Sequence, residues 1–262
     1  MTVQNDGLCW RLVIDADPRT GSRNMALDHA LTECLKPDEG VVRLYGWSPP
    51  TISFGRNEPS RGRFDVEAVA LEGIAFVRRA TGGRVVLHDE EVTYAVVAPL
   101  KALGGLRDAY HAINRGLVAG LHSVGVEARL EEGGAVLTPD AGPCFQVPAP
   151  GEVTAKGRKL VGSAQVRLGS ALLQHGSVIL RGDQGPVVRL SGGHEDPAPP
   201  ATVEDLADDA VDDAAVTEAL SAGLRLALGG SWDEGAYRSW EIDAADRLER
   251  DRYATEGWTW RR

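Results

Sequence analysis

The sequence predicts a mixed α+β fold. Extended patterns fill the middle of the chain, where β-branched and aromatic residues cluster, whereas residues 213–252 have helical periodicity. No internal repeat stands out, and 262 residues lie within the range of one large α/β unit. We therefore expect a single domain with a largely antiparallel mixed sheet flanked by helices.

The first part of the chain is expected to alternate between strands and helices. Cys9–Ile14 is typical of a strand, and apolar residues at helical spacing follow Ser22, which we expect to be the N-cap. Cys34 lies on the apolar face of this helix and is expected in the core. A short helix is expected at Asp65–Glu72. Further strands are expected at Val41–Trp47, Thr51–Gly55, Ala75–Arg79, Val85–Leu87 and Val92–Val97.

The second part begins with an amphipathic helix. Apolar residues from Leu106 to Val124 are spaced three and four apart. Val153–Ile179 alternates in polarity, which predicts antiparallel strands. We expect its tight turns at Gly157, Gly162, Gly169 and Gly176. A mobile loop at 182–200, rich in Gly, Pro and Asp, and helices at Asp213–Leu228 and Glu234–Arg252 complete the prediction.

Charge and cysteine content exclude several classes of protein. The chain has 28 basic and 38 acidic residues, a net charge of −10, which disfavours general binding to nucleic acid or anionic membranes. Its three cysteines show no disulfide framework and no metal-ligand spacing. The sequence has no apolar run near the ~18 residues of a membrane span and no secretory signal, so the expected compartment is the cytoplasm.

The segment Arg78–Asp89 (RRATGGRVVLHD) is the most unusual stretch. Gly82 and Gly83 allow backbone conformations closed to other residues, so their N–H groups could hold a phosphate or a carbonyl oxygen. The alternative is a hairpin turn with solvated arginines. For His88 taken alone, a structural role is favoured over a role in a site.

Cys144 is a candidate nucleophile. It lies among glycine and proline residues between Pro139 and Pro150, where a side chain can face a cleft, although a loop cysteine can also be incidental. A free thiol has a pKa of about 8.5 and becomes a good nucleophile only when a nearby cation lowers that pKa.

Lys159 is the candidate cation. It lies in Val153–Gly182, which contains no Asp or Glu, so we expect either a basic surface that attracts acidic partners or strands that balance the acidic stretch Glu204–Glu218. The small residues Gly162, Ser163 and Ala164 follow Lys159 and would leave room for a slender chain. A lysine there could hold a carbonyl oxygen or stabilise a thiolate. His175 and Gly176 form a second polar turn, or simply close a hairpin.

Together these motifs resemble the lipoate–protein ligase/biotin ligase/octanoyltransferase superfamily (BPL/LPL). The resemblance extends over nearly the whole chain, in order. Its motifs are Asn24-Met-Ala-Leu-Asp28, Arg43-Leu-Tyr-Gly-Trp47, Thr51-Ile-Ser-Phe-Gly55, Arg78–Asp89, Cys144, Gly157–Gln165, Leu173-Gln-His-Gly176 and Tyr253-Ala-Thr-Glu-Gly-Trp258. Two details resemble its octanoyltransferase branch: Arg84 replaces the third glycine usual in ATP-using ligases, and Cys144 matches the acyl-thioester cysteine.

The resemblance implies one catalytic domain over residues 1–262 and a two-step octanoyl transfer. Octanoyl on acyl carrier protein would pass to Cys144, and then to a lysine of a lipoyl domain such as the glycine cleavage H protein. Lys159 would lower the pKa of Cys144 and stabilise the oxyanion. The implied substrate-binding residues are Arg79, Thr81, Gly82, Gly83, Arg84, His88, Gly162, Ser163, Ala164, His175 and Gly176. No metal, nucleotide or redox cofactor is implied, and we expect a monomer.

Three other functions remain open. An ATP-dependent lipoate–protein ligase would lack a use for Cys144, and the residues after the catalytic core are too few for a sizeable accessory domain. An amidotransferase between lipoyl domains would use the same cysteine and lysine. A module that binds lipoyl domains without catalysis would not need Cys144, Lys159 or His88.

Overall fold

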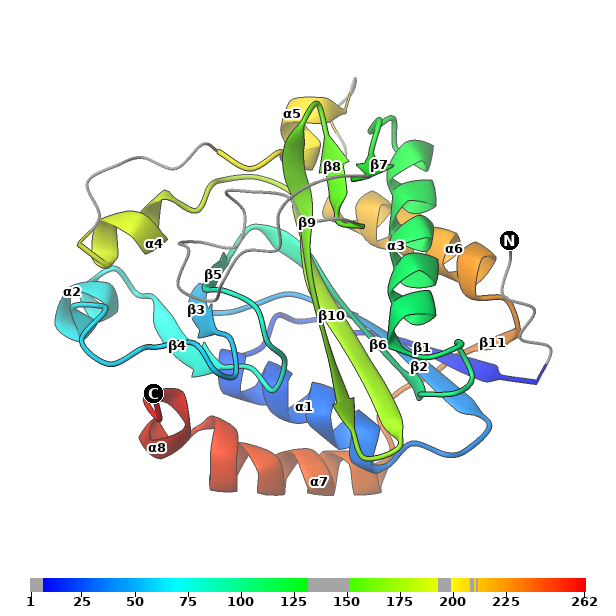
Figure 1. Cartoon of the computed structure of the whole chain (residues 1–262), viewed down its shortest axis with the longest axis horizontal. Helices are drawn as coiled ribbons and strands as arrows, with labels where there is room; N and C mark the ends of the chain where they lie inside the picture. Colours follow the sequence, from blue (N-terminus) through cyan, green and yellow to red (C-terminus); the bar gives the residue numbers. More distant parts are fainter. Residues whose placement is uncertain (1–6, 132–150, 193–198, 208–209, 211) are drawn as a thin grey trace.

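The computed structural model describes residues 7–131, 151–192, 199–207, 210 and 212–262. In this part of the chain an eight-stranded sheet lies between two helical layers, and a three-stranded sheet stands beside it (Figure 1). From edge to edge the strands of the large sheet are β11 (Ser231–Glu234), β1 (Cys9–Ile14), β2 (Glu39–Tyr45), β6 (Glu91–Pro99), β10 (Ala171–Ile179), β9 (Arg158–Leu168), β8 (Val153–Ala155) and β7 (Arg129–Leu130).

Most neighbouring strands of the large sheet are antiparallel. β1 is parallel to both β2 and β11, and the remaining pairs from β2 to β7 are antiparallel. The small sheet has the order β4 (Ala75–Arg78), β3 (Thr51–Phe54) and β5 (Val86–His88). The predicted α+β class with a mixed, largely antiparallel sheet is therefore confirmed.

The helices cover both faces of the large sheet. α1 (Gly21–Glu33) and α7 (Ser239–Leu248) pack on one face, and α3 (Leu106–Ser123) and α6 (Asp213–Leu228) pack on the other (Figure 1). A π-helical turn, η1 (Glu249–Tyr253), and α8 (Glu256–Thr259) continue from α7. α2 (Val66–Leu71) and α4 (Gly185–Leu190) pack on the small sheet, and α5 (Val203–Leu206) precedes α6.

Burial on both faces explains the sequence of the central strands. β2 is fully buried and has few polar residues, as expected for a strand covered on both sides. One apolar core lies on the α3–α6 side and includes Trp10, Tyr94 and Ile113. A second lies on the α1–α7 side and includes Leu27 and Val97. No helix in the described ranges is both long and apolar enough to cross a membrane.

Several local expectations are corrected at the ends of elements. The N-cap of α1 is Thr20, whose hydroxyl accepts from the backbone N–H of Arg23, and Ser22 lies in the first turn. Cys34 is the half-exposed C-cap of the same helix. The helix expected from Glu234 begins at Ser239, because residues 231–234 pair with β1 instead. The expected loop at 182–200 contains α4, and its residues 193–198 lie outside the described part.

The glycines of the predicted hairpin region have two different roles. Gly157 and Gly169 have positive φ angles, 76° and 59°, and make the expected turns. The expected turns at Gly162 and Gly176 are wrong, because both residues lie inside strands β9 and β10. Glycine inside a strand often marks a close approach of another group to the backbone.

Glycine contacts also set the spacing of α3 and α6. A Cβ on Gly223 would lie 2.2 Å from the carbonyl oxygen of Gly116, and a Cβ on Gly120 would lie 2.5 Å from that of Ala219. Gly223→Ala is therefore expected to lower the free energy of unfolding by about 1–3 kcal/mol, since the helices must separate. Urea denaturation followed by tryptophan fluorescence measures this loss. Gly257→Ala, where no atom lies within 4 Å, is the control and should leave stability unchanged or slightly higher; equal effects at both positions would contradict the close packing.

Candidate active site

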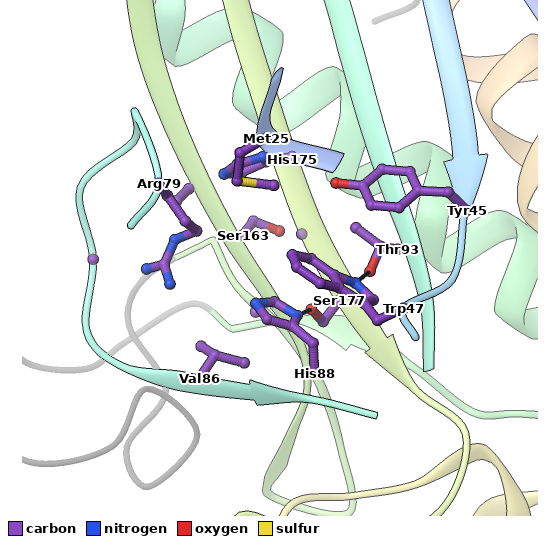
Figure 2. A pocket seen from close by; sticks show the side chains of 14 residues that line it. Met25, Tyr45, Trp47, Arg79, Val86, His88, Thr93, Ser163, His175 and Ser177 are labelled. Atoms are coloured by element: carbon purple, nitrogen blue, oxygen red, sulfur yellow. Dashed lines mark hydrogen bonds between the residues drawn. The ribbon is translucent and has the colours of Figure 1, made fainter. Parts of the chain in front are cut away.

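A pocket lies between the α1 face of the large sheet and the loop between β4 and β5 (Figure 2). About 410 Å³ of space there is free of protein atoms, and part of this space is open to solvent. Its lining residues are Met25, Tyr45, Trp47, Arg79, Gly83, Val86, His88, Thr93, Gly162, Ser163, Ala164, His175, Gly176 and Ser177. Three of the predicted motifs, which are far apart in the sequence, therefore meet around one cavity.

The wall formed by β9 and β10 has almost no side-chain volume. Gly176 pairs with Ser163, and Ser177 pairs with Gly162. A Cβ on Gly176 would lie 2.4 Å from the carbonyl oxygen of Gly162 and 2.8 Å from the ring of Tyr94. Gly176 is therefore required by the packing, and the predicted slot of small residues at 162–164 lines the pocket.

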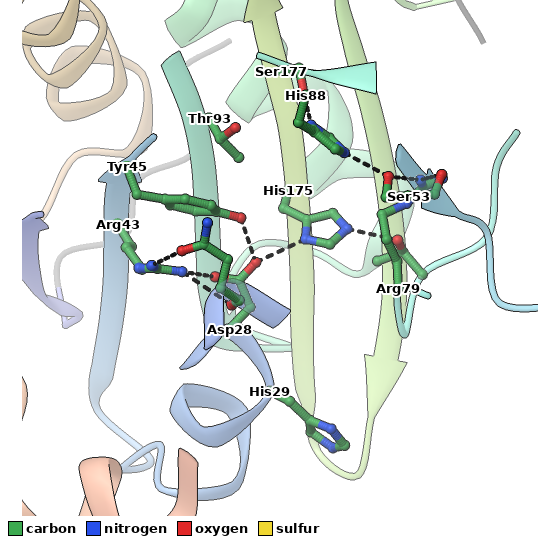
Figure 3. Close-up of polar contacts among 12 residues, drawn as sticks. Asp28, His29, Arg43, Tyr45, Ser53, Arg79, His88, Thr93, His175 and Ser177 are labelled. Carbon is green, nitrogen blue, oxygen red and sulfur yellow. Dashed lines mark hydrogen bonds and ion pairs between the residues drawn. The ribbon is translucent and has the colours of Figure 1, made fainter. Parts of the chain in front are cut away.

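A buried carboxylate, Asp28 on α1, anchors one side of the pocket (Figure 3). It accepts hydrogen bonds from Arg43 Nη1 (2.8 Å), Tyr45 Oη (2.9 Å) and His175 Nδ1 (2.9 Å). Because an ionised carboxylate only accepts, Nδ1 of His175 carries the proton. Nε2 then accepts from the Thr81 hydroxyl, 2.7 Å away.

The environment fixes the charge of both members of this pair. Burial alone would raise the pKa of Asp28, but the hydrogen bond from His175 and the charge of Arg43 hold it below its usual value. Burial, together with the charge of Arg79, lowers the pKa of His175 despite its hydrogen bond to Asp28. At neutral pH the carboxylate is therefore ionised and the imidazole is neutral.

His88 has a parallel arrangement on the other side of the pocket (Figure 3). Its Nδ1 lies 2.8 Å from Glu91 Oε1, and its Nε2 lies 2.6 Å from Ser53 Oγ. Its ring stacks on Trp47 with centroids 4.0 Å apart. Ser177 and Thr93 also donate to the Glu91 carboxylate. His88 is thus a member of a buried network that also faces the cavity.

The glycine–arginine loop is held from inside by Arg79. Its guanidinium donates to the carbonyl oxygens of Ser53 (2.8 Å), Gly82 (3.2 Å) and Arg84 (2.9 Å). Arg78, Arg79 and Arg84 are all buried, so the alternative of a turn with solvated arginines is wrong. Burial and the nearby charge of Arg261 lower the pKa of Arg78 to about 10.

Lys159 reaches the pocket face of the sheet through an irregularity in β9. Val161 pairs with Val153 but Lys159 pairs with Thr154, so Leu160 is an extra residue. Leu160 and Val161 both pack into the core on the α3 side. Lys159 therefore lies on the opposite face, the face of Gly162 and Ala164.

The Lys159 side chain is buried and paired. It is 2% exposed, and its Nζ lies 2.6 Å from Glu152 Oε1. A buried ammonium keeps its charge only with such a partner. Cys144, its predicted catalytic partner, lies outside the described residues.

Of the eleven predicted substrate-binding residues, eight line the pocket and three belong to the adjoining loop. The eight that line the cavity are Arg79, Gly83, His88, Gly162, Ser163, Ala164, His175 and Gly176. Thr81, Gly82 and Arg84 instead belong to the hydrogen-bonded frame of the loop. No group of three or more His, Cys, Asp or Glu in the described ranges could hold a metal ion.

Several residues of the site had no role assigned from the sequence. Asp28, Arg43, Ser53, Glu91 and Glu152 all bond to side chains of the pocket or to Lys159. A signal existed for Asp28, a carboxylate on the apolar face of a helix. For Glu152 the only signal was its position, seven residues before Lys159.

Carboxylates from elsewhere in the chain pair with three basic residues of the acid-free stretch Val153–Gly182, whereas Lys156 and Arg167 form no salt bridge among the described residues. Besides the Lys159–Glu152 pair, Arg158 lies 3.6 Å from Asp205, and Arg181 bonds to Asp213 at 2.9 Å. The alternative, that this stretch balances the acidic segment after residue 204, is confirmed for these two arginines.

Comparison with known proteins identifies the family. The family model described as the lipoyl protein ligase A/B catalytic domain matches residues 20–224. The chain belongs to this family. A curated relative, the octanoyltransferase LipM of Kyrpidia tusciae, is 36% identical over 97% of this chain and 99% of its own length. That of Symbiobacterium thermophilum is 34% identical over 97% and 98%.

Solved structures of the lipoyl protein ligase A/B family share the fold. A putative lipoate protein ligase from T. acidophilum superposes with a TM-score of 0.82 at 22% identity, over 97% of this chain and all of that one. A lipoate-protein ligase A bound with ATP gives a TM-score of 0.81 at 22% identity, over 97% and 99%. The family-model match and the LipM relatives, together with this shared fold, confirm the predicted superfamily.

The three bonds to Asp28 lead to a stability prediction. Asp28→Asn keeps one acceptor oxygen but replaces the other by an amide N–H₂, so either the bond from Arg43 or the present bonds from Tyr45 and His175 are lost. The free energy of unfolding should therefore fall by about 1–3 kcal/mol at pH 7. Chemical denaturation measures it, with Asp38→Asn on the exposed surface as the control.

The loss in Asp28→Asn should be at least as large at pH 5. The depressed pKa of Asp28 means that its contribution is fully present above its ordinary value of 3.8 and disappears only in stronger acid. The lowered pKa of His175 also costs stability below pH 6.5, and more so without Asp28. A loss that disappears at pH 5 would contradict an ionised Asp28.

Proposed function

We propose that the protein transfers octanoyl groups in protein lipoylation, through an acyl thioester on Cys144. The proposal is supported by full-length relatives that carry the name octanoyltransferase LipM. The observation that carries it is the place of Lys159, a buried ammonium on the same sheet face as the glycine-lined slot. We also propose that residues 1–262 form one catalytic domain that acts as a monomer in the cytoplasm.

The first step is acyl transfer to the enzyme. The Cys144 thiolate attacks the carbonyl carbon of octanoyl-[acyl carrier protein], a new C–S bond forms, and the C–S bond to the carrier breaks. The carrier leaves as a thiolate and takes up the proton that Cys144 released when it ionised. Lys159 favours the thiolate and stabilises the negative charge that develops on the carbonyl oxygen. The slender octanoyl chain lies along Gly162–Ala164, where side chains are smallest.

The second step transfers the octanoyl group to the acceptor. The ε-amine of a lysine on a lipoyl domain, such as that of the glycine cleavage H protein, attacks the Cys144 thioester. The C–N bond forms, the C–S bond breaks, and the proton lost by the amine goes to the Cys144 sulfur, which leaves as a thiol. Both steps are acyl transfers between donors of similar chemistry, so no metal, nucleotide or redox cofactor is required.

Two rival activities use the same fold. An ATP-dependent ligase would bind an adenylate at the loop, and solved ligases share this architecture. Here, however, Arg84 takes the place of the third glycine, and its side chain is buried in the loop. An amidotransferase would take its octanoyl group from another lipoyl domain. Comparing octanoyl-[acyl carrier protein] with octanoyl-H protein as donors distinguishes this activity from the proposed one. A binding module without catalysis gives no use to the buried Lys159.

The covalent mechanism predicts a single octanoyl adduct. Wild-type protein mixed with octanoyl-[acyl carrier protein], without nucleotide, should gain one octanoyl mass, labile to hydroxylamine, as measured by intact mass spectrometry. The adduct should be absent in Cys144→Ala and in Cys144→Ser. Cys34→Ala, which removes a half-exposed thiol elsewhere, is the control and should still form it. An adduct that persists in Cys144→Ala, or that requires ATP, would refute the mechanism.

The Lys159–Glu152 pair predicts a positioning role for Glu152. Glu152→Gln removes the negative charge that lies 2.6 Å from Lys159 Nζ. We therefore expect kcat to fall by roughly 10- to 100-fold, less than the ~10²–10³-fold cost of losing an electrostatic group outright. The KM for the carrier should change little, and Glu152→Asp should recover part of the rate. Glu127→Gln, the same change at an exposed site, is the control. A rise in KM with unchanged kcat would contradict this role.

A further inference from the structure

Two segments far apart in the sequence form an arginine-rich surface. Residues 55–63 and 250–262 together contain seven arginines and three acidic residues, in a chain of net charge −10. The backbone N–H groups of Ser60 and Arg61 both donate to the carbonyl oxygen of Arg262 at 3.0 Å, and Arg61 Nε donates to that of Trp260 at 2.6 Å. These bonds fix the two segments side by side, near the C-terminus in Figure 1.

Five side chains define this arginine surface: Arg56, Arg61, Arg252, Arg261 and Arg262. Arg56, Arg61 and Arg262 are exposed. Arg252 and Arg261 both stack on the Trp258 ring, with their guanidinium carbons 4.8 Å and 4.5 Å from its centroid. The surface is therefore built on an aromatic support and does not consist of freely moving side chains alone.

The charge of the arginine surface is not balanced by carboxylates of the described residues. None of its five members forms a salt bridge there, whereas Arg63 is paired with Glu58 and Arg250 with Asp251. The Nε of Arg261 is buried without a hydrogen-bond partner. Burial, followed by the charges of Arg262, Arg56 and Arg252, lowers the pKa of Arg261. An anionic partner would relieve this mutual repulsion.

The arginine surface is continuous with the loop that lines the pocket. The backbone N–H of Arg56 donates to the carbonyl oxygen of Thr81 at 2.7 Å. A Cβ on Gly55 would lie only 1.9 Å from the carbonyl oxygen of Gly83, so the two backbones touch. Gly82 and Gly83 are exposed, and Gly83 lines the pocket. A partner bound to the arginines therefore has a short path to the cavity.

We propose that the arginine surface docks the acidic carrier protein that delivers the acyl thioester. This inference rests on the proposed function and names the surface that its donor uses. A carrier protein presents acidic side chains, and its thioester arm contains a phosphodiester, so both parts suit arginines that adjoin a glycine loop. The acceptor presents a lysine, whose positive charge this surface repels.

Charge reversal at two exposed members tests the proposal. Arg56→Glu/Arg262→Glu should weaken binding of octanoyl-[acyl carrier protein] roughly tenfold at low salt, and less at high salt, because exposed pairs are screened. Fluorescence anisotropy of a labelled carrier measures Kd independently of catalysis. Lys101→Glu/Arg115→Glu makes the same change in charge at exposed positions by the opposite helical layer and should leave Kd unchanged.

Two further measurements separate the possible failures. Octanoyl-pantetheine lacks both the carrier protein and the phosphate, so the rate of octanoyl transfer from it should be the same in the wild type and in all variants. If the wild type transfers no octanoyl group from octanoyl-pantetheine, the proposed function is refuted rather than the docking surface. An unchanged carrier Kd in Arg56→Glu/Arg262→Glu, or an equal loss in the control pair, would overturn the docking proposal. Weaker binding of the lipoyl-domain acceptor with an unchanged carrier Kd would also overturn it, and would assign the surface to the acceptor.

Discussion

One buried carboxylate, Asp28, connects the elements that build the pocket. It lies on α1 and accepts hydrogen bonds from Arg43 and Tyr45 on β2 and from His175 on β10. Burying an ionised carboxylate without hydrogen-bond donors is costly in free energy. Because all three donors to Asp28 must be in place at once, its hydrogen bonds form only in one arrangement of helix and sheet. A displacement of α1 along the sheet would break these bonds together, so the position of this face of the pocket is strongly determined.

Hydrogen bonds also connect Asp28 to the glycine–arginine loop. His175 carries the interaction to Thr81, and a second chain runs from Glu91 through His88 and Ser53. In each chain a carboxylate lies at Nδ1 of the histidine and a hydroxyl at Nε2, which selects one tautomer. A loop with two adjacent glycines has high backbone freedom in isolation. Here it is fixed at Thr81 and, through Arg79, at Ser53, so the N–H groups of the glycines are held in place before any ligand arrives.

Much of this structure could be predicted from the sequence, because local patterns decide local structure. The period of α3 and the alternation of β9 and β10 gave correct elements, since each depends on neighbours a few residues away. The prediction of turns at Gly162 and Gly176 is wrong because glycine serves both turns and close strand approaches. At Gly176 the close approach is made by Tyr94 and by the Gly162 carbonyl oxygen, which are tertiary contacts that no local pattern reveals. The contact between Glu152 and Lys159 depends on the extra residue Leu160, which shifts the register of β9. No pattern of polarity in the sequence reveals this shift.

Charge is the property for which sequence and surface differ most. The stretch 153–182 has no acidic residue, yet Arg158 and Arg181 find carboxylates from α5 and α6. The arginine surface, in contrast, comes from segments that each contain acids, and it forms only because the end of the chain packs beside residues 55–63. Ion pairing is decided by distance in space, so a run of like charge in the sequence predicts little about the surface potential. An acidic protein can therefore attract an acidic partner to one face, provided that its own carboxylates are engaged elsewhere.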